Sequence, residues 1–136
     1  DSEMKFTHKA FVRWNDLDAF GHVNNAKYLT YAESARIDWG QQQFAAEADS
    51  VLIQMTVARS EVDYLLPITE FEQYYDVDLW VESIGNSSFV VGYEVSKDAV
   101  IFTKMKTVQV MIDLVSRKSR PITDNERNFL TNYLVK

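Results

Sequence analysis

One stretch of helical periodicity, residues 24–43, lies between segments that alternate like β-strands, and this arrangement constrains the fold more than any other feature. It opens at Asn24, a residue type that caps helix N-termini well. Apolar side chains then recur at steps of three and four residues: Tyr28, Tyr31, Ala32, Ala35 and Trp39, with Leu29 alongside. We therefore expect one helix of about 20 residues that is apolar around much of its circumference.

The remaining periodic segments predict strands. Residues 4–14, 52–65, 75–82, 89–95 and 100–115 are rich in β-branched and aromatic residues. In the third of these, Tyr75, Val77, Leu79 and Val81 share one face, and Trp80 is on the other. In residues 52–65 the apolar face changes between Val57 and Val62, which predicts either a β-bulge or a strand that is partly buried on both faces.

The connections define how these strands pair. Residues 83–88 and 97–99 are short enough to require antiparallel neighbours. Thr123 and Glu126 form a capping-box pattern that predicts a short C-terminal helix. The fold class is therefore α+β, a five-stranded antiparallel sheet wrapped around one long helix. We expect a single domain over residues 1–136, with open sheet edges that invite pairing with a second copy.

Composition excludes several classes of function. The absence of cysteine removes disulfides, thiol nucleophiles and cysteine-based zinc sites. A net charge of −6 argues against non-specific nucleic-acid binding. No apolar run reaches the roughly 18 residues of a membrane span, and the N-terminus lacks the apolar core of a signal peptide. We expect a cytoplasmic protein without a membrane partner, metal or cofactor.

Charge is distributed unevenly along the chain. Residues 1–99 hold 7 basic and 17 acidic side chains, whereas residues 100–136 hold 7 basic and 3 acidic side chains. The basic C-terminal part could attract an anionic ligand. A solvated strand edge and tail explains the same pattern equally well.

Polar residues crowd the entrance of the predicted helix. The pattern Asp-x-Asp-x-x-Gly-His-Val-Asn-Asn-x-x-Tyr runs from Asp16 to Tyr28. It closely resembles the signature of the hotdog-fold acyl-CoA thioesterases, specifically the 4-hydroxybenzoyl-CoA thioesterase-like family. The order of strands and helix over residues 4–115 agrees with the hotdog fold of that family.

The resemblance implies hydrolysis of a thioester to a carboxylic acid and free CoA or a carrier thiol. It assigns the catalytic carboxylate to Asp18, as nucleophile or general base, and carbonyl polarisation to the helix N-terminus around Asn25 and Ala26. This division of labour is chemically sound, because a helix N-terminus offers unpaired N–H groups and positive potential. Similar plant acyl-carrier-protein thioesterases use an Asp-x-Asn-x-His set, in which Asp18 and His22 match but Phe20 replaces the Asn.

Neighbouring polar residues have more than one interpretation. Asp16 is expected to be structural, and His22 either orients Asp18, binds the thioester or only stabilises a turn. Asn24 caps the helix, and Gly21 answers a backbone demand for positive φ or close approach. Glu33 and Arg36 are expected to form a local ion pair, although Glu33 could instead reach an active site. No role is assigned to Glu61 or Asp63, which follow on a later strand.

Candidate substrate-binding residues are more dispersed. Tyr28 is a core residue that could also form a wall of the acyl pocket. Strand 87–97 of the second subunit is the candidate for another wall, with Ser87 and Ser88 near the pocket entrance. Basic residues are the candidates to contact the phosphates of CoA: Lys104, Lys106, Arg117, Lys118 and Arg120. Asn86 stands where related proteins often have a basic residue.

The leading hypothesis is an acyl-CoA thioesterase that acts as a homodimer or homotetramer, with sites between subunits. A non-catalytic acyl-CoA or lipid-binding hotdog module and an acyl-carrier-protein thioesterase remain alternatives. The acidic composition favours CoA over acidic carrier proteins. The His-containing signatures of hotdog dehydratases are not found in the sequence.

Overall fold

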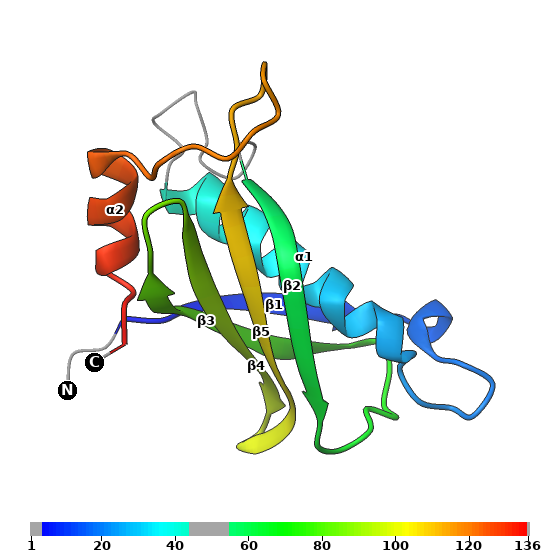
Figure 1. Cartoon of the computed structure of the whole chain (residues 1–136). Helices are drawn as coiled ribbons and strands as arrows, with labels where there is room; N and C mark the ends of the chain where they lie inside the picture. Colours follow the sequence, from blue (N-terminus) through cyan, green and yellow to red (C-terminus); the bar gives the residue numbers. More distant parts are fainter. Residues whose placement is uncertain (1–3, 44–54, 136) are drawn as a thin grey trace.

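The computed structural model describes residues 4–43 and 55–135. Within these residues, five strands and three helices follow one another (Figure 1). They are β1 (Phe6–Val12), η1 (Trp14–Asp16), α1 (Asn25–Gln43), β2 (Met55–Tyr64), β3 (Gln73–Ile84), β4 (Ser88–Lys97), β5 (Val100–Met111) and α2 (Asp124–Thr131).

All strands belong to one antiparallel sheet with the order β1-β3-β4-β5-β2. The long helix α1 lies across one face of this sheet, which we call the inner face, and the opposite face is the outer face (Figure 1). β1 and β2 are the two edge strands. The predicted α+β architecture is therefore confirmed.

The core forms where α1 meets the inner face. The helix contributes five buried apolar side chains, namely Tyr28, Tyr31, Ala32, Ala35 and Trp39. Alternate residues of β3 and β4 bury the facing set: Tyr75, Val77, Leu79, Val81, Phe89, Val91, Tyr93 and Val95. The helical set and the β3 residues were predicted from periodicity, because buried side chains recur every 3.6 residues in a helix and every 2 in a strand.

The C-terminal helix α2 covers the far end of α1. Trp39, which is 1% exposed, packs against Phe129 and Tyr133 with ring centroids 5.0 and 5.3 Å apart. The predicted capping box is present, because the Thr123 hydroxyl accepts from the Glu126 N–H while the Glu126 carboxylate accepts from the Thr123 N–H. Removing an aromatic core side chain of this kind typically costs about 3–5 kcal/mol.

Two local features of the strands test the predictions made from the sequence. The expected bulge in β2 occurs between Val57 and Arg59, where the register with β5 shifts. By contrast, β5 ends at Met111 rather than at residue 115. The cause is Asp113, whose carboxylate accepts from the N–H groups of Val115 and Ser116 and so folds the chain into a turn.

Candidate active site

A buried carboxylate anchors the loop between β1 and α1. Asp16 is 2% exposed and accepts the Tyr31 hydroxyl at 2.8 Å and the Arg13 N–H at 3.1 Å. Burial alone would raise the pKa of Asp16, but the hydrogen bonds from Arg13 and Tyr31 and the charges of Arg13 and Lys27 outweigh it and lower the pKa. Asp16 thus fastens the loop to α1, in agreement with its expected structural role.

Asp18 lies on the same loop with one carboxylate oxygen engaged and the other open. Its Oδ1 accepts from the N–H groups of Phe20 at 2.9 Å and His22 at 3.4 Å. No hydrogen bond of Oδ2 is found among the described residues. The turn that builds this arrangement requires positive φ at Gly21, which has φ 76°. A Cβ there would meet no neighbour within 4 Å, so conformation and not close approach explains the glycine.

The surroundings of Asp18 form an open hollow of about 360 Å³. It is lined by Trp14, Asn15, Leu17, Asp18, Ala19 and Gly21. Two aromatic side chains of this loop are strongly exposed: Trp14 at 66% and Phe20 at 84%. The Asp18 carboxylate can therefore be reached from solvent.

The N-terminus of α1 follows shortly after Asp18 in the chain. Asn24 caps it, because its Oδ1 accepts from the Ala26 N–H at 3.0 Å. The Ala26 amide is thereby occupied, whereas the Asn25 N–H has no hydrogen-bond partner among the described residues. The Asn25 carbonyl accepts from the Tyr64 hydroxyl of β2 at 3.2 Å. Of the two backbone N–H groups predicted to polarise the thioester carbonyl, those of Asn25 and Ala26, only that of Asn25 is therefore available.

His22 contributes to the loop through its backbone. Its N–H donates to Asp18 Oδ1, and its carbonyl accepts from the Asp18 N–H at 2.8 Å. The residue is exposed, and its imidazole makes no hydrogen bond or ion pair with the described part of the chain. The turn interpretation of His22 accounts for these contacts, and its imidazole remains available to a ligand.

The predicted substrate-binding residues do not converge on Asp18 within one chain. Tyr28 is buried beside Tyr31 and Tyr64 at the α1 N-terminus. Ser87 and Ser88 lie at the turn between β3 and β4, near the opposite end of α1 (Figure 1).

The register along β5 gives the scale of this separation. Tyr64, which contacts the α1 N-terminus, pairs with Thr103, whereas Ser88 pairs with Val110. About seven residues of strand separate these two rungs, roughly 23 Å. Ser87 and Ser88 therefore cannot line the pocket entrance beside the Asp18 of their own chain.

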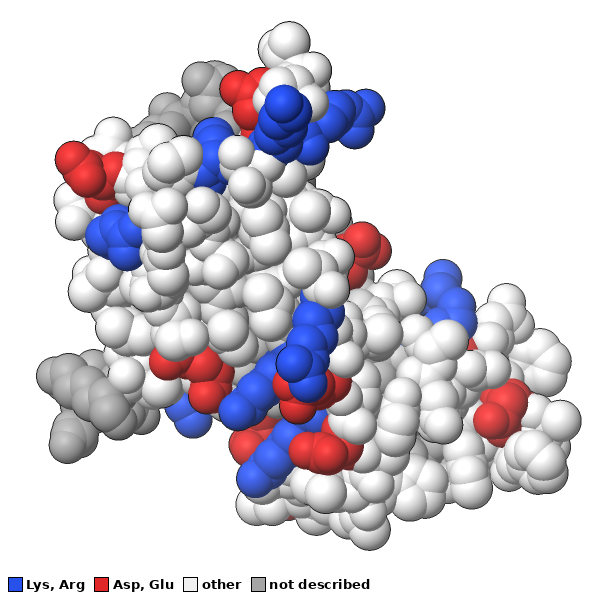
Figure 2. Space-filling model, in the orientation of Figure 1, with Lys and Arg blue, Asp and Glu red and all other residues white. Residues whose placement is uncertain are grey.

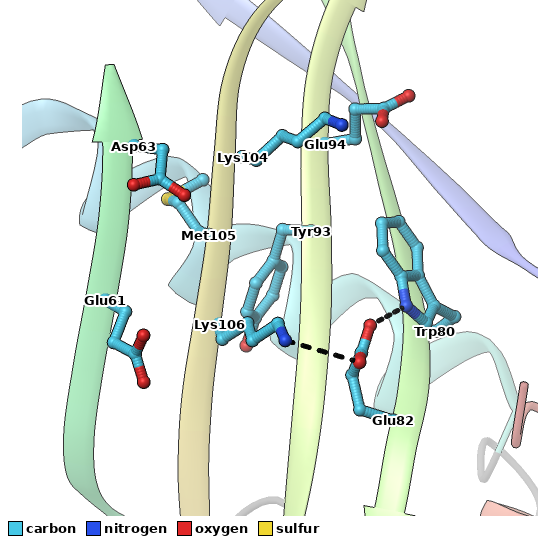
Figure 3. Close-up of a pocket in the computed structure, with 9 residues that line it drawn as sticks. All are labelled: Glu61, Asp63, Trp80, Glu82, Tyr93, Glu94, Lys104, Met105 and Lys106. Atoms are coloured by element: carbon cyan, nitrogen blue, oxygen red, sulfur yellow. Dashed lines mark hydrogen bonds and ion pairs between the residues drawn. The ribbon is translucent and has the colours of Figure 1, made fainter. Parts of the chain in front are cut away.

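Lys104 and Lys106 project from the outer face of the sheet (Figure 3). The residues that alternate with them, Thr103, Met105 and Thr107, are buried on the inner face. Lys106 lies 3.6 Å from Glu82, and Lys104 is paired in register with Asp63. Glu61 and Asp63 line the same outer hollow. These four residues lie on the face of the sheet opposite α1 and therefore away from Asp18. Their positions in the sequence alone did not show this.

The remaining basic candidates are on the segment between β5 and α2. Arg117 and Lys118 are exposed in the turn after β5, which forms the basic projection at the top of the molecule (Figure 2). Arg120 instead makes a two-point contact with Glu126, at 2.9 and 2.8 Å. That contact raises the pKa of Arg120 and ties its guanidinium to α2, which weakens its case as a CoA ligand.

The expected local ion pair between Glu33 and Arg36 is wrong. Arg36 is buried and donates to the Tyr93 hydroxyl at 2.9 Å, and Tyr93 is in turn hydrogen-bonded to Thr107 at 2.6 Å. No carboxylate within the described residues lies within 4.0 Å of Arg36. Sequence spacing allowed the pair but held no signal for Tyr93, which comes from β4.

Within residues 4–43 and 55–135, no group of three or more His, Cys, Asp or Glu side chains is placed to hold a metal ion. In the same part of the chain, no helix has the length and apolar run needed to cross a bilayer.

A curled antiparallel sheet around one long helix defines a hotdog protein, and the Asp18 loop lies at the N-terminus of that helix. The sequence profile of the Thioesterase-like superfamily matches residues 12–130. The chain belongs to this superfamily and is a thioester hydrolase, which confirms the resemblance to the hotdog-fold acyl-CoA thioesterases.

Several relatives have the same fold over nearly their whole length. A structure described as a predicted thioesterase from Bacillus stearothermophilus is 26% identical, covers 98% of both chains and has a TM-score of 0.86. A thioesterase from Thermus thermophilus, complexed with coenzyme A and Zn, is 31% identical over 91% of this chain and 90% of that one, with a TM-score of 0.77. The 1,4-dihydroxy-2-naphthoyl-CoA hydrolase of Nostoc punctiforme is 28% identical, over 89% of this chain and 83% of its own.

Proposed function

We propose that this protein hydrolyses acyl-CoA thioesters to a carboxylic acid and free CoA, with Asp18 as the catalytic carboxylate. The observation that carries the proposal is the placement of Asp18: one oxygen is fixed by two backbone N–H groups, and the other is open beside a helix N-terminus. The names of two relatives, a CoA hydrolase and a thioesterase bound to coenzyme A, support the substrate class.

Each part of the site has a task in the reaction. The Asn25 N–H and the α1 dipole stabilise the oxyanion that develops on the thioester carbonyl, a donor typically worth about 3 kcal/mol. Asp18 either attacks the carbonyl carbon, giving a mixed anhydride that water cleaves, or takes a proton from an attacking water. In both routes the C–S bond breaks and the CoA thiolate leaves and is protonated.

The complete site requires two copies of the chain. Asp18 and the α1 N-terminus come from one copy, whereas Ser87, Ser88, Arg117 and Lys118 lie at the opposite end of α1. If two chains pair along the open edges of their β2 strands with two-fold symmetry, the second chain lies antiparallel to the first. The end of the second chain that carries Ser87 and Ser88 then lies toward the Asp18 of the first. A homodimer is therefore the minimum unit of the proposal, and a homotetramer is two such units.

The test is release of free thiol from a panel of acyl-CoAs and from acyl-carrier-protein thioesters. We expect turnover of at least one acyl-CoA by the wild-type protein and its loss in Asp18→Asn. Binding of acyl-CoA without any thiol release would favour a non-catalytic binding module. Turnover of carrier-protein thioesters and not of acyl-CoAs would show that the protein is an acyl-carrier-protein thioesterase.

A further inference from the structure

A groove runs along the inner side of β2, between this edge strand and α1. Two adjoining hollows of about 390 and 260 Å³ form it, and both include Glu33, Arg36 and Val57. One end lies at the N-terminal half of α1, near Leu29, Thr30 and Ser60. The other end lies near Ile37, Met55, Thr56 and Gln109. The groove therefore leads from the vicinity of the proposed thioester site along the helix.

The floor of this groove is polar, unlike the rest of the inner face. β3 and β4 turn apolar or aromatic side chains inward, but β5 turns Thr103, Thr107 and Gln109 inward, and all three are buried. The Gln109 side chain is 1% exposed, and its Oε1 has no hydrogen-bond partner among the described residues. Such an orphaned acceptor is uncommon in folded proteins and costly when no ligand completes it.

Arg36 adds an under-used donor to the same hollow. The residue is 8% exposed, and its one hydrogen bond among the described residues goes to the Tyr93 hydroxyl. A guanidinium offers five N–H donors in a fixed plane. Arg36 and Gln109 both line the larger hollow. The Gln109 Oε1 is buried and has no partner in the described part of the chain, so a ligand in the hollow would reach it after a rotation of the amide group.

We propose, on the basis of the proposed thioesterase function, that this groove binds the acyl group and that Arg36 and Gln109 recognise a hydroxyl on it. A hydroxyl accepts from the Arg36 guanidinium and at the same time donates to Gln109 Oε1. A carboxylate fits less well, because it cannot donate to Gln109 and because Glu33 lines the same hollow with its own negative charge. The substrate class is therefore hydroxyacyl thioesters.

The position of Arg36 along α1 limits where the hydroxyl lies on the chain. Arg36 follows Asn25 by about eleven residues, roughly 16 Å of helix rise. Helical side chains lean toward the N-terminus, which shortens this distance by several ångströms. An extended hydrocarbon chain covers the remainder with on the order of ten carbons.

The experiment compares kcat/KM for 10-hydroxydecanoyl-CoA with kcat/KM for decanoyl-CoA, together with the ω-carboxyl analogue of the same length. A hydrogen bond to a charged donor predicts a preference for the hydroxyacyl substrate of roughly 10- to 100-fold. Arg36→Met and Gln109→Met should each reduce this preference, taken as the ratio of the two kcat/KM values on the same variant, to near unity. Lys9→Met, on the outer face of the distant strand β1, should keep the preference.

Binding measurements separate this proposal from the proposed function. Dissociation constants for the same three ligands, measured calorimetrically on the slow variant Asp18→Asn, should show the same order. Equal affinity for decanoyl- and 10-hydroxydecanoyl-CoA would overturn the groove assignment even if hydrolysis is observed. Preference for the ω-carboxyl ligand would overturn the proposal that the groove recognises a hydroxyl, and would show that it recognises an anion. A thermal melt of each variant verifies that it is folded.

Discussion

The hydroxyl of Tyr31, on the second turn of α1, donates to the buried carboxylate of Asp16 across 2.8 Å. Asp16 also accepts from the Arg13 backbone, and its carbonyl accepts from the Asn24 N–H at 2.9 Å. One residue thus joins the start of the loop, the helix cap and the helix itself. This connection fixes the Asp18 loop relative to the N-terminus of α1, on which carbonyl polarisation depends.

Replacing Tyr31 by Phe should lower the free energy of unfolding by about 1 kcal/mol at neutral pH, because a buried carboxylate loses a donor. The folded pKa of Asp16 lies below its ordinary value of 3.8, so its contribution is fully present above that pH and is lost as pH falls through the folded pKa. Urea denaturation should show a difference at pH 7 that narrows below pH 3.8. Tyr74→Phe, at an exposed site, is the matched control. A difference that does not change with pH would contradict the role of Asp16.

Replacing Asp18 by Asn should lower kcat by about a hundredfold or more, the scale of lost acid–base catalysis. The amide oxygen of Asn can still accept from the Phe20 and His22 N–H groups, so the loop and the thermal midpoint should be preserved. Asp63→Asn removes a carboxylate from the outer face of β2 and should leave kcat unchanged. A near-wild-type rate in Asp18→Asn would remove the basis of the catalytic assignment.

Replacing His22 by Ala should be milder, a loss of kcat within about 10- to 100-fold. The backbone N–H that contacts Asp18 remains in the variant, and the imidazole has no protein partner among the described residues. His8→Ala is the matched control, since it removes the contact with Asp38 at 2.8 Å but lies on β1. It should affect the thermal midpoint more than the rate. If His22→Ala loses as much activity as Asp18→Asn, the imidazole has a direct catalytic role.

The elements of the fold could be predicted because each buries a repeating face. The spacing of Tyr28, Tyr31, Ala35 and Trp39 identified the buried side of α1, and alternation identified the inward residues of β3. Asp18 was assigned through the resemblance of residues 16–28 to a family signature, and its catalytic role stays a proposal. Its hydrogen bonds lie within four residues, so the loop that holds it is a local structure.

Contacts between distant segments could not be predicted in this way. Arg36 has two neighbours of interest, Glu33 on its own helix and Tyr93 on β4, and only the first is visible in the spacing. Lys104 was grouped with Arg117 by charge, although strand alternation turns Lys104 to the outer face. Charge similarity along the chain does not say which face of a sheet a residue occupies.

Gly92 on β4 has a role that could not be expected from its place in the sequence. The Trp80 indole lies across it on the outer face, and a Cβ at position 92 would stand 2.6 Å from two ring atoms. Gly92→Ala should therefore displace the indole and destabilise the fold by about 1–3 kcal/mol, with a change in Trp fluorescence. In a Trp80→Ala background the same substitution should cost little. Equal costs in both backgrounds would show that the indole is not the obstacle.

Assembly should depend on the open edge of β2. Light scattering at micromolar concentration should give twice the chain mass of 15.8 kDa, or four times for a tetramer. Ala58 is exposed at the bulge of this strand and lines neither hollow of the groove, so Ala58→Lys should place a charge in the interface, shift the mass toward the monomer and reduce activity in parallel. Val100→Lys, with 42% exposure at the start of β5, places the same charge away from that edge and should remain a dimer. Because the proposed site takes Asp18 from one chain and Ser87 and Ser88 from the other, a monomer that hydrolyses acyl-CoA at the full rate would refute the shared site.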